Sequence, residues 1–369
     1  MTPFFCMKKK SIIVLSFSLF CMASVFGTTK YFVQTKFANQ KDAVDKPMVE
    51  ESFSDVLAAI TLQAKKEGVS ETVIKKYLTT VKPFPEEKSA LTSKMSRAEI
   101  ESHKFSIPDF RELIADRISK KTVDEFLSNN KKNLLLISKK YQVPPQYILV
   151  MLGLESEFGR NVGKKPLLQA LVNTAYEDKE RRNYFSQLAV DALKILEKSH
   201  PVLPQQLEST FDGGMGIPQF EPSTYLELAV SFAGNGQPNI WTNMNDAMAS
   251  TANFLHQLGW RENESWGYPV LLPNDSDQWV QLAKEQKEQS IADWLKLGIK
   301  FKVTPEKVDN TLKAELLLPY GVKGPAFLVL HNYHVLKLWN ASTNESVATG
   351  LLADEYEKDL FPTKRAAHQ

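Results

Sequence analysis

Cysteine is nearly absent from this sequence of 369 residues, which contains only Cys6 and Cys21. Both lie near the N-terminus, in a segment where three consecutive lysines precede a mainly apolar run over residues 12–26. That run is too short and too often interrupted by serine to span a bilayer, and Gly27 supplies a small residue at its end. We therefore interpret residues 1–27 as a secretory signal peptide, with an uncleaved membrane anchor as the alternative.

Loss of this segment would leave a mature chain without cysteine, so disulfide bonds and thiol catalysis are both excluded from it. Lipid attachment at Cys21 is not expected, because the bulky Phe20 directly before it suits lipoprotein processing poorly. Either Met1 or Met7 fits as the start of translation, since the basic stretch begins directly after Met7.

A large charge of either sign is also missing. The formal net charge is +2, and removal of three lysines and no acids with residues 1–27 changes it to −1. A nucleic acid is therefore not an expected partner. The six histidines are scattered, and the HExxH, GxSxG and GxxxxGK[ST] motifs do not occur. No metal or nucleotide cofactor is expected from these motifs.

Most of the remaining sequence has helical periodicity. Residues 28–48 are polar and unpatterned, and we interpret them as a flexible tether. Two short helices are then predicted between about residues 53 and 78, with a break at Gly68. More helix is predicted within residues 107–143, either broken at Asn129-Asn130 or continuous. The predicted fold class is mainly α.

The stretch GLESEFGR, residues 153–160, ends a helix that is predicted over about 144–158. Residues 148–154 include no polar side chain, so this helix is expected to be buried. Glu155 and Glu157 fall in its last turn, where desolvation and the negative end of the helix dipole both disfavour an ionised carboxylate. A proton that is retained near neutral pH suits a general acid, such as glycosidic bond cleavage uses.

The local pattern does not decide between a catalytic and a structural acid. The structural alternative is a buried ion pair, for example Glu157 with Arg160. Two residues are separated by about 200° around a helix of about 3.6 residues per turn, so at most one of the two acids faces a given pocket.

Two further features are consistent with a polymer-binding groove. Residues 209–241 contain five of the sixteen glycines beside Gln219 and Phe220, which indicates either an ordinary loop or a close approach of a polymer to the backbone. All six tryptophans lie between Trp241 and Trp339. Sugar rings pack on aromatic faces, although core packing is the alternative explanation.

Four segments, taken in order and spacing, carry a family resemblance. They are PPQYILVMLGLESEFGRNVGK, FDGGMGIPQFEPSTY, MNDAMASTANFLHQLGW and LHNYHVLKLWNAST. Together they resemble the lytic murein transglycosylase B (MltB) family over about residues 49–355. The resemblance implies a helical N-terminal part, about 49–130, a lysozyme-like catalytic core, about 131–355, and a C-terminal tail, 356–369. It also implies a periplasmic enzyme that cleaves peptidoglycan glycan strands.

The resemblance implies a role for one acid. In the family the first acid of the G-[LVI]-E-[ST]-x-[FW]-G-R block is catalytic, and it corresponds to Glu155, whereas Glu157 stands at a variable position. Glu155 would protonate the leaving oxygen of the β-1,4 bond between N-acetylmuramic acid and N-acetylglucosamine. It would then take the proton of the C6 hydroxyl, so that a 1,6-anhydro ring closes without water.

Other positions are implied with the same resemblance, and some depart from the family. The implied substrate-binding residues are Arg181, Tyr184, Thr210, Gln219, Phe220, Trp339 and Asn340. Asp212 stands where a small residue is common, and as a second carboxylate it would raise the proton affinity of Glu155 further. Trp339 and Phe254 stand where the family often has tyrosine.

The segment after residue 230 corresponds to a calcium loop in some family members. A calcium site needs several oxygen ligands, some of them carboxylates, but this chain offers Ser231, Asn235 and, farther on, Asp246. Tight calcium binding is therefore not expected. The expected partners are peptidoglycan strands, with other cell-wall enzymes as candidates, and the chain is expected to be a monomer. The alternatives are a catalytically weak peptidoglycan-binding or scaffold protein and a hydrolytic muramidase that uses Asp212.

Overall fold

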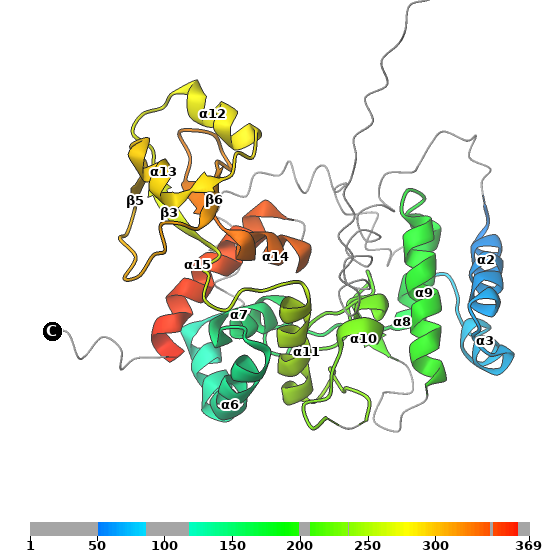
Figure 1. The fold of residues 1–369 in the computed structure, drawn as a ribbon. Helices are drawn as coiled ribbons and strands as arrows, with labels where there is room; N and C mark the ends of the chain where they lie inside the picture. Colours follow the sequence, from blue (N-terminus) through cyan, green and yellow to red (C-terminus); the bar gives the residue numbers. More distant parts are fainter. Residues whose placement is uncertain (1–50, 86–117, 199–206, 235, 340–341, 361–369) are drawn as a thin grey trace, which may run out of the picture. The chain divides into compact units, whose positions relative to one another are not determined.

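The structure is a computed structural model that describes residues 51–85, 118–198, 207–234, 236–339 and 342–360 (Figure 1). Contacts within the chain separate residues 1–41 from the rest, and all described residues belong to the second unit. The predicted signal peptide, 1–27, and tether, 28–48, lie outside the described residues.

The first described helices are α2 (Phe53–Lys66) and α3 (Glu71–Leu78). Ser52 and Ser70 begin them, because each hydroxyl accepts a hydrogen bond from a backbone N–H of the first turn. Gly68 lies between the two helices with a φ of 86°. The prediction of two short helices with a break at Gly68 is confirmed.

The main body is helical, and α7 lies at its centre. This helix packs against α6, α11 and α15 (Figure 1). Its residues from Pro145 to Gly153 are all buried, so the predicted burial is confirmed. The helices of the body are α6 (Lys120–Tyr141), α7 (Pro145–Ser156), α8 (Leu167–Glu177), α9 (Arg182–Glu197), α10 (Pro222–Leu228), α11 (Met244–Gln257), α14 (His331–Trp339) and α15 (Thr343–Leu360).

Two predicted boundaries fall inside helices and are corrected by the structure. Helix α6 continues through Asn129-Asn130, so the division at 130/131 does not separate two structural parts. Helix α15 extends to Leu360, and Tyr356 within it is only 8% exposed. The Tyr356 hydroxyl donates to the carbonyl of Ile118 at 2.8 Å, and Leu360 is also buried, so the end of α15 packs against the core and is not part of a tail.

A five-stranded antiparallel sheet between α11 and α14 was not predicted from the sequence. Its strand order is β4-β6-β7-β3-β5, and it has its own apolar core around Trp279 and Trp294. Two of its strands, β4 and β5, are only two residues long, which leaves too little alternation to recognise. The elements are β3 (Gly267–Leu271), α12 (Asp277–Lys284), β4 (Gln289–Ser290), α13 (Ile291–Lys296), β5 (Lys300–Phe301), β6 (Lys313–Leu317) and β7 (Ala326–Val329).

A second, two-stranded ladder connects the segment after GLESEFGR, residues 153–160, with the start of the glycine-rich stretch of residues 209–241. Strand β1 (Lys165–Pro166) pairs antiparallel with β2 (Glu208–Ser209). Gly163 allows this approach, because a Cβ at that position would lie 2.3 Å from the carbonyl oxygen of Ser209. The loops that follow α7 and β2 are therefore held side by side.

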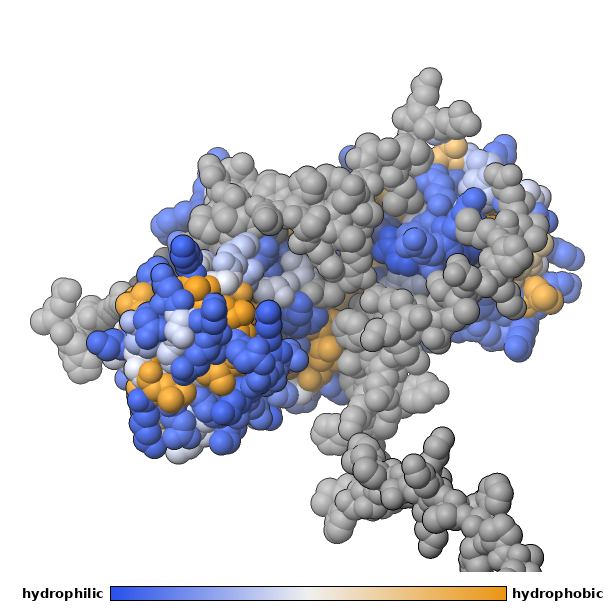
Figure 2. Space-filling model, turned by 90° about the horizontal axis from the view of Figure 1, so that it is seen from above, coloured by the Kyte–Doolittle hydropathy of each residue, from blue (hydrophilic) through white to orange (hydrophobic). Residues whose placement is uncertain are grey.

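One face of the described residues is mostly polar (Figure 2). The coloured part of the face in Figure 2 is largely hydrophilic, with hydrophobic side chains in small groups among the polar ones. None of the described helices combines the length and the apolar character that are needed to cross a membrane.

Candidate active site

Glu155 lies half-buried in the last turn of α7. The helix ends at Ser156, because Glu157 and Phe158 adopt left-handed φ values of 52° and 57° before Gly159 at 90°. Phe158 N–H donates to the Leu152 carbonyl at 3.2 Å, which closes the end of the helix. Glu157 is therefore the C-cap residue and not part of the last turn. The helix ends before Gly159, which was predicted to stop it.

Trp339, at the end of α14, holds one oxygen of Glu155. Its indole Nε1–H donates to Glu155 Oε1 at 2.6 Å. An indole nitrogen is a donor only, so Oε1 must act as an acceptor. The carbonyl oxygen of a neutral carboxyl group is the stronger acceptor, so this hydrogen bond favours the proton of neutral Glu155 on Oε2.

Two buried rings keep Trp339 in this position. Phe254 lies edge-on to Trp339 with ring centroids 4.6 Å apart, and Phe220 lies 5.6 Å away. Phe220 is only 3% exposed, so it offers little surface to a ligand. In the structure its ring supports Trp339, and its predicted role as a substrate contact stays a prediction.

Glu157 does not form the ion pair that was considered for it. Arg160 instead pairs with Glu125 of α6 at 2.8 Å. This pair lies near the surface, with side chains 46% and 58% exposed, and is expected to contribute little to stability. The catalytic role of Glu155 stays a prediction.

Ser156, which sequence reasoning did not single out, joins the two motifs. Its hydroxyl donates to the carbonyl of Ile217 at 2.6 Å and accepts from the N–H of Gly159 at 2.9 Å. In the sequence, the only indication of this role was the position of Ser156 between the two acids of the GLESEFGR block. The hydrogen bonds hold the end of α7 against the loop that carries Gln219.

Thr210 and Gln219 face each other across Gly214. A Cβ on Gly214 would lie 2.9 Å from Thr210 Oγ1 and 2.8 Å from Gln219 Oε1. Gln219 has a left-handed φ of 54°, and its Nε2 donates to the carbonyls of Gly216 at 2.7 Å and Val162 at 3.2 Å. The structure thus brings these two predicted residues together and fixes the orientation of the Gln219 amide.

Asp212 lies beside Thr210. Thr210 Oγ1 donates to Asp212 Oδ1 at 2.6 Å, and the carboxylate is otherwise exposed. The predicted second acid therefore acts on Thr210 directly, and its effect on Glu155 stays a prediction.

Arg181 and Tyr184 are both engaged by acids of the chain. Arg181 pairs with Asp178, with Nε donating to Oδ2 at 2.7 Å. The Tyr184 hydroxyl donates to Glu221. Burial, followed by the charge of Glu221, raises the pKa of Tyr184 above its ordinary value, so its hydroxyl stays protonated. Asn340, the remaining predicted contact, lies outside the described residues.

Comparison with protein families places this site in a known group. A family described as "Transglycosylase SLT domain" matches residues 52–354. The chain belongs to this transglycosylase family. The match includes both motifs, the inserted sheet and most of α15, and it confirms the predicted relationship.

Individual relatives agree with the family assignment. The membrane-bound lytic murein transglycosylase B of Escherichia coli is 30% identical over 215 residues, which cover 56% of this chain and 55% of that protein. The chain thus aligns with about half of the length of this relative. The structure of SltB3 from Pseudomonas aeruginosa in complex with NAG-anhNAM-pentapeptide has a TM-score of 0.70 at 29% identity, over 83% of this chain and 80% of that chain.

A third similarity bears on the fold alone. The E. coli lytic transglycosylase Slt35 in complex with calcium has a TM-score of 0.64 at 24% identity, over 83% of this chain and 93% of that chain. The mainly helical, lysozyme-like transglycosylase fold is therefore confirmed.

The loop after α10 does not fit a tight calcium site. Asp246 is 4% exposed, and its two oxygens accept the backbone N–H groups of Phe232 and Asn239, each at 2.8 Å. Gln237 Oε1 is buried without a hydrogen-bond partner in the described chain, so a neutral oxygen is present there. Together with Ser231 and Asp246, this oxygen would bind calcium poorly, because the Asp246 carboxylate already accepts hydrogen bonds from backbone N–H groups. Asn235 lies outside the described residues.

We expect Asp246→Asn to destabilise the protein by about 2 kcal/mol, because an amide nitrogen would face a backbone N–H donor in a buried place. Thermal unfolding measures the loss, and Asp277→Asn, at an exposed acid of α12, is the matched control. Calcium and chelator should leave the melting temperature of the wild type unchanged. A calcium-dependent rise that Asp246→Asn removes would contradict this account of the loop.

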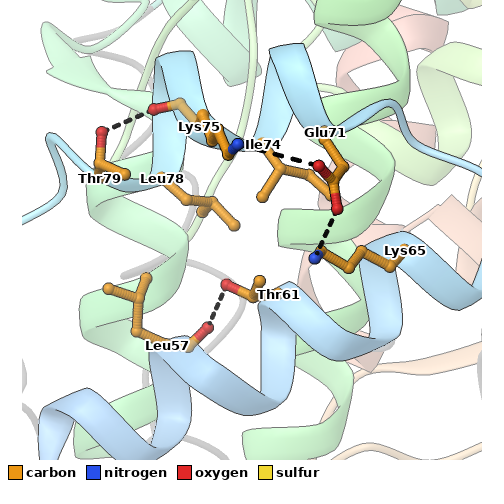
Figure 3. A pocket seen from close by; sticks show the side chains of 8 residues that line it. All are labelled: Leu57, Thr61, Lys65, Glu71, Ile74, Lys75, Leu78 and Thr79. Carbon is orange, nitrogen blue, oxygen red and sulfur yellow. Dashed lines mark hydrogen bonds and ion pairs between the residues drawn. The ribbon is translucent and has the colours of Figure 1, made fainter.

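A separate cavity lies between α2 and α3 and has a volume of about 210 Å³ (Figure 3). Its walls are the apolar side chains of Leu57, Ile74 and Leu78. The charged groups at its rim are already paired, since Lys65 contacts Glu71 at 2.9 Å. The cavity involves no residue of the predicted site, and we assign it to the packing of the helix pair.

Proposed function

We propose that this protein is a lytic transglycosylase that cleaves the bond between N-acetylmuramic acid and N-acetylglucosamine in peptidoglycan and leaves 1,6-anhydro ends, in cell-wall remodelling and turnover. The observation that carries the proposal is the half-buried Glu155, one oxygen of which accepts a hydrogen bond from Trp339. Family membership supports it, as does the complex of the related SltB3 with NAG-anhNAM-pentapeptide.

Glu155 alone would carry both proton transfers. Its Oε2–H protonates the glycosidic oxygen while the bond from that oxygen to C1 breaks, and the acetamido oxygen of the muramic unit stabilises the positive charge at C1. The ionised carboxylate then removes the proton of the C6 hydroxyl, whose oxygen bonds to C1. The acid is restored, and no water is consumed.

Thr210 is suited to orient the acetamido group. Its hydroxyl proton is committed to Asp212, and one lone pair accepts from the Gly214 N–H at 3.0 Å, so Thr210 presents its second lone pair to a ligand. A Thr210 oxygen that accepts from the acetamido N–H would direct the acetamido carbonyl toward C1. Asp212 would thus act through Thr210 as a positioning residue.

Two other functions remain as outcomes of the test. A hydrolytic muramidase would need a base to activate water, and Asp212 is the acid near Thr210 that suggests one. A binding or scaffold protein would keep the groove without turnover, and the intact Glu155 argues against it.

We also propose that the protein is exported to the periplasm. The support is the basic and then apolar sequence of residues 1–27, together with the nature of the proposed substrate, which lies outside the cytoplasm. The expected partners are glycan strands, and other cell-wall enzymes are candidates.

Mass spectrometry of purified peptidoglycan digested with the mature protein tests the proposed activity. Products with anhydromuramyl ends are expected. Products with reducing ends would identify a hydrolase, and the absence of products from well-folded protein that co-sediments with peptidoglycan would identify a binding protein.

We expect Trp339→Phe to reduce kcat about tenfold, because it removes one hydrogen bond to a charged group while keeping an aromatic ring. The indole N–H stabilises the ionised form of Glu155, so its loss should also move the alkaline limb of the kcat profile to higher pH. Phe254→Leu, which disturbs the support of Trp339 without touching Glu155, is the comparison. An unchanged pH profile in Trp339→Phe would show that the hydrogen bond does not act on the acid.

A further inference from the structure

A lysine lies over two aromatic rings next to the loop that carries Thr210. Lys165 Nζ is 4.6 Å from the ring centre of Phe211 and 5.6 Å from that of Phe84. The two rings contact each other edge to face, with centroids 5.4 Å apart. All three side chains are half-buried, so each keeps an exposed part.

The backbone of each member is held by a different element. Lys165 is paired with Ser209 in the β1–β2 ladder. Phe84 N–H donates to Asn173 Oδ1 of α8 at 2.6 Å. The Phe211 carbonyl accepts from the Thr174 hydroxyl, also of α8, at 2.9 Å. The cluster is thus part of the folded framework and not a chance contact of mobile side chains.

The cluster adjoins the residues that would orient the sugar. Phe211 lies between Thr210 and Asp212 in the chain. Lys165 follows the segment whose Val162 carbonyl accepts from Gln219. A glycan unit whose acetamido group reaches Thr210 would therefore place its substituents near this cluster.

The charge of Lys165 has no acid to balance it in the part of the chain that the structure describes. The ring faces attract the ammonium group, but they do not neutralise it. Asp212, the neighbouring acid in the loop, accepts from the hydroxyl of Thr210 and keeps its charge, but it forms no ion pair with Lys165 in the described chain. A carboxylate brought by a ligand would gain a charge-assisted hydrogen bond from Lys165.

We propose that Lys165, Phe84 and Phe211 form a subsite for a carboxylate of the peptide stem on the muramic acid unit. This inference rests on the proposed function and names a second part of the same substrate. The stem is linked to the lactyl group of that sugar, carries ionised carboxylates and short apolar side chains, and so matches a cation beside two ring faces. The subsite favours strands that keep their stems.

Binding of Lys165→Met to three insoluble peptidoglycan preparations tests the subsite. The first has intact stems, the second has its stem carboxylates converted to methylamides, and the third has its stems removed by an amidase, which leaves the lactyl carboxylate. The Kd should rise about tenfold on intact strands, as loss of one charged hydrogen bond predicts, and stay unchanged on the other two. Lys165→Arg should keep most of the affinity.

Lys164→Met is the matched control, because it removes the same charge at the exposed neighbouring residue. An equal loss in Lys164→Met, or an equal loss of Lys165→Met on all three preparations, would overturn the subsite. A loss on intact and amidase-treated strands but not on methylamides would assign Lys165 to the lactyl carboxylate instead, and would also overturn it. Anhydro ends are assayed in the same tubes, so that a failure of the proposed activity is distinguished from a failure of the subsite.

Discussion

Glu155→Gln is expected to lower the formation of anhydro-ended products by roughly 10³-fold, within the range that loss of a general acid produces. The amide has the same shape, and its oxygen can still accept from the Trp339 indole. It cannot release a proton to the leaving oxygen, nor can it take one from the C6 hydroxyl. Single-turnover digestion of purified strands, followed by mass spectrometry, measures the effect.

Glu157→Gln is the control for this experiment, since it makes the same change two residues along the chain. Its activity should stay within about twofold of the wild type, because Glu157 caps α7 outside the predicted site. If Glu155→Gln retains more than a tenth of the wild-type rate, the proton donor lies elsewhere and Glu155 is a half-buried structural acid.

Gly214→Ala is expected to reduce kcat/KM by about 100-fold, as a displacement of about 1 Å in a site can do. The backbone at Gly214 does not have the left-handed φ that excludes alanine, so the effect arises from the new methyl group. That group would lie under 3 Å from both Thr210 Oγ1 and Gln219 Oε1 and would push them apart. Steady-state kinetics on soluble glycan strands, with thermal unfolding in parallel, separates this loss from unfolding.

Gly234→Ala provides the comparison. A Cβ at Gly234 meets no atom within 4 Å, although its φ of 78° makes alanine strained. We expect a stability loss of about 1 kcal/mol and unchanged kinetics. Wild-type kinetics in Gly214→Ala would show that the spacing of Thr210 and Gln219 is not needed for turnover.

Much of the helical framework could be predicted from local pattern. Helix α7 was recognisable because an uninterrupted apolar run of that length has to be buried all round. The break at Gly68 marked the division between α2 and α3. The inserted sheet was not predicted. Its short strands β4 and β5 depend on pairing with strands that are distant in sequence, since β4 pairs with β6 and β5 pairs with β3.

The motifs predicted which residues belong to the site, but they did not predict the contact that each residue makes there. Trp339 was expected to stack on sugar, but its position is defined by a hydrogen bond to Glu155, 184 residues away. Phe220 was expected to touch substrate, yet packing against Phe254 and Trp339 buries it. The role of Ser156 in joining the end of α7 to the next loop is defined by its hydrogen bond to the Ile217 carbonyl.

The sequence by itself determined that an acidic motif follows the apolar run of the buried helix and which loops contain the glycines, because periodicity and backbone freedom are local properties. Tertiary structure decided which oxygen of Glu155 is held, that Asp212 acts on Thr210, and that Asp246 closes its loop with backbone donors. It also brought Lys165, Phe84 and Phe211 together. These contacts join residues whose distance in space depends on the packing of whole elements, and no local pattern encodes that distance.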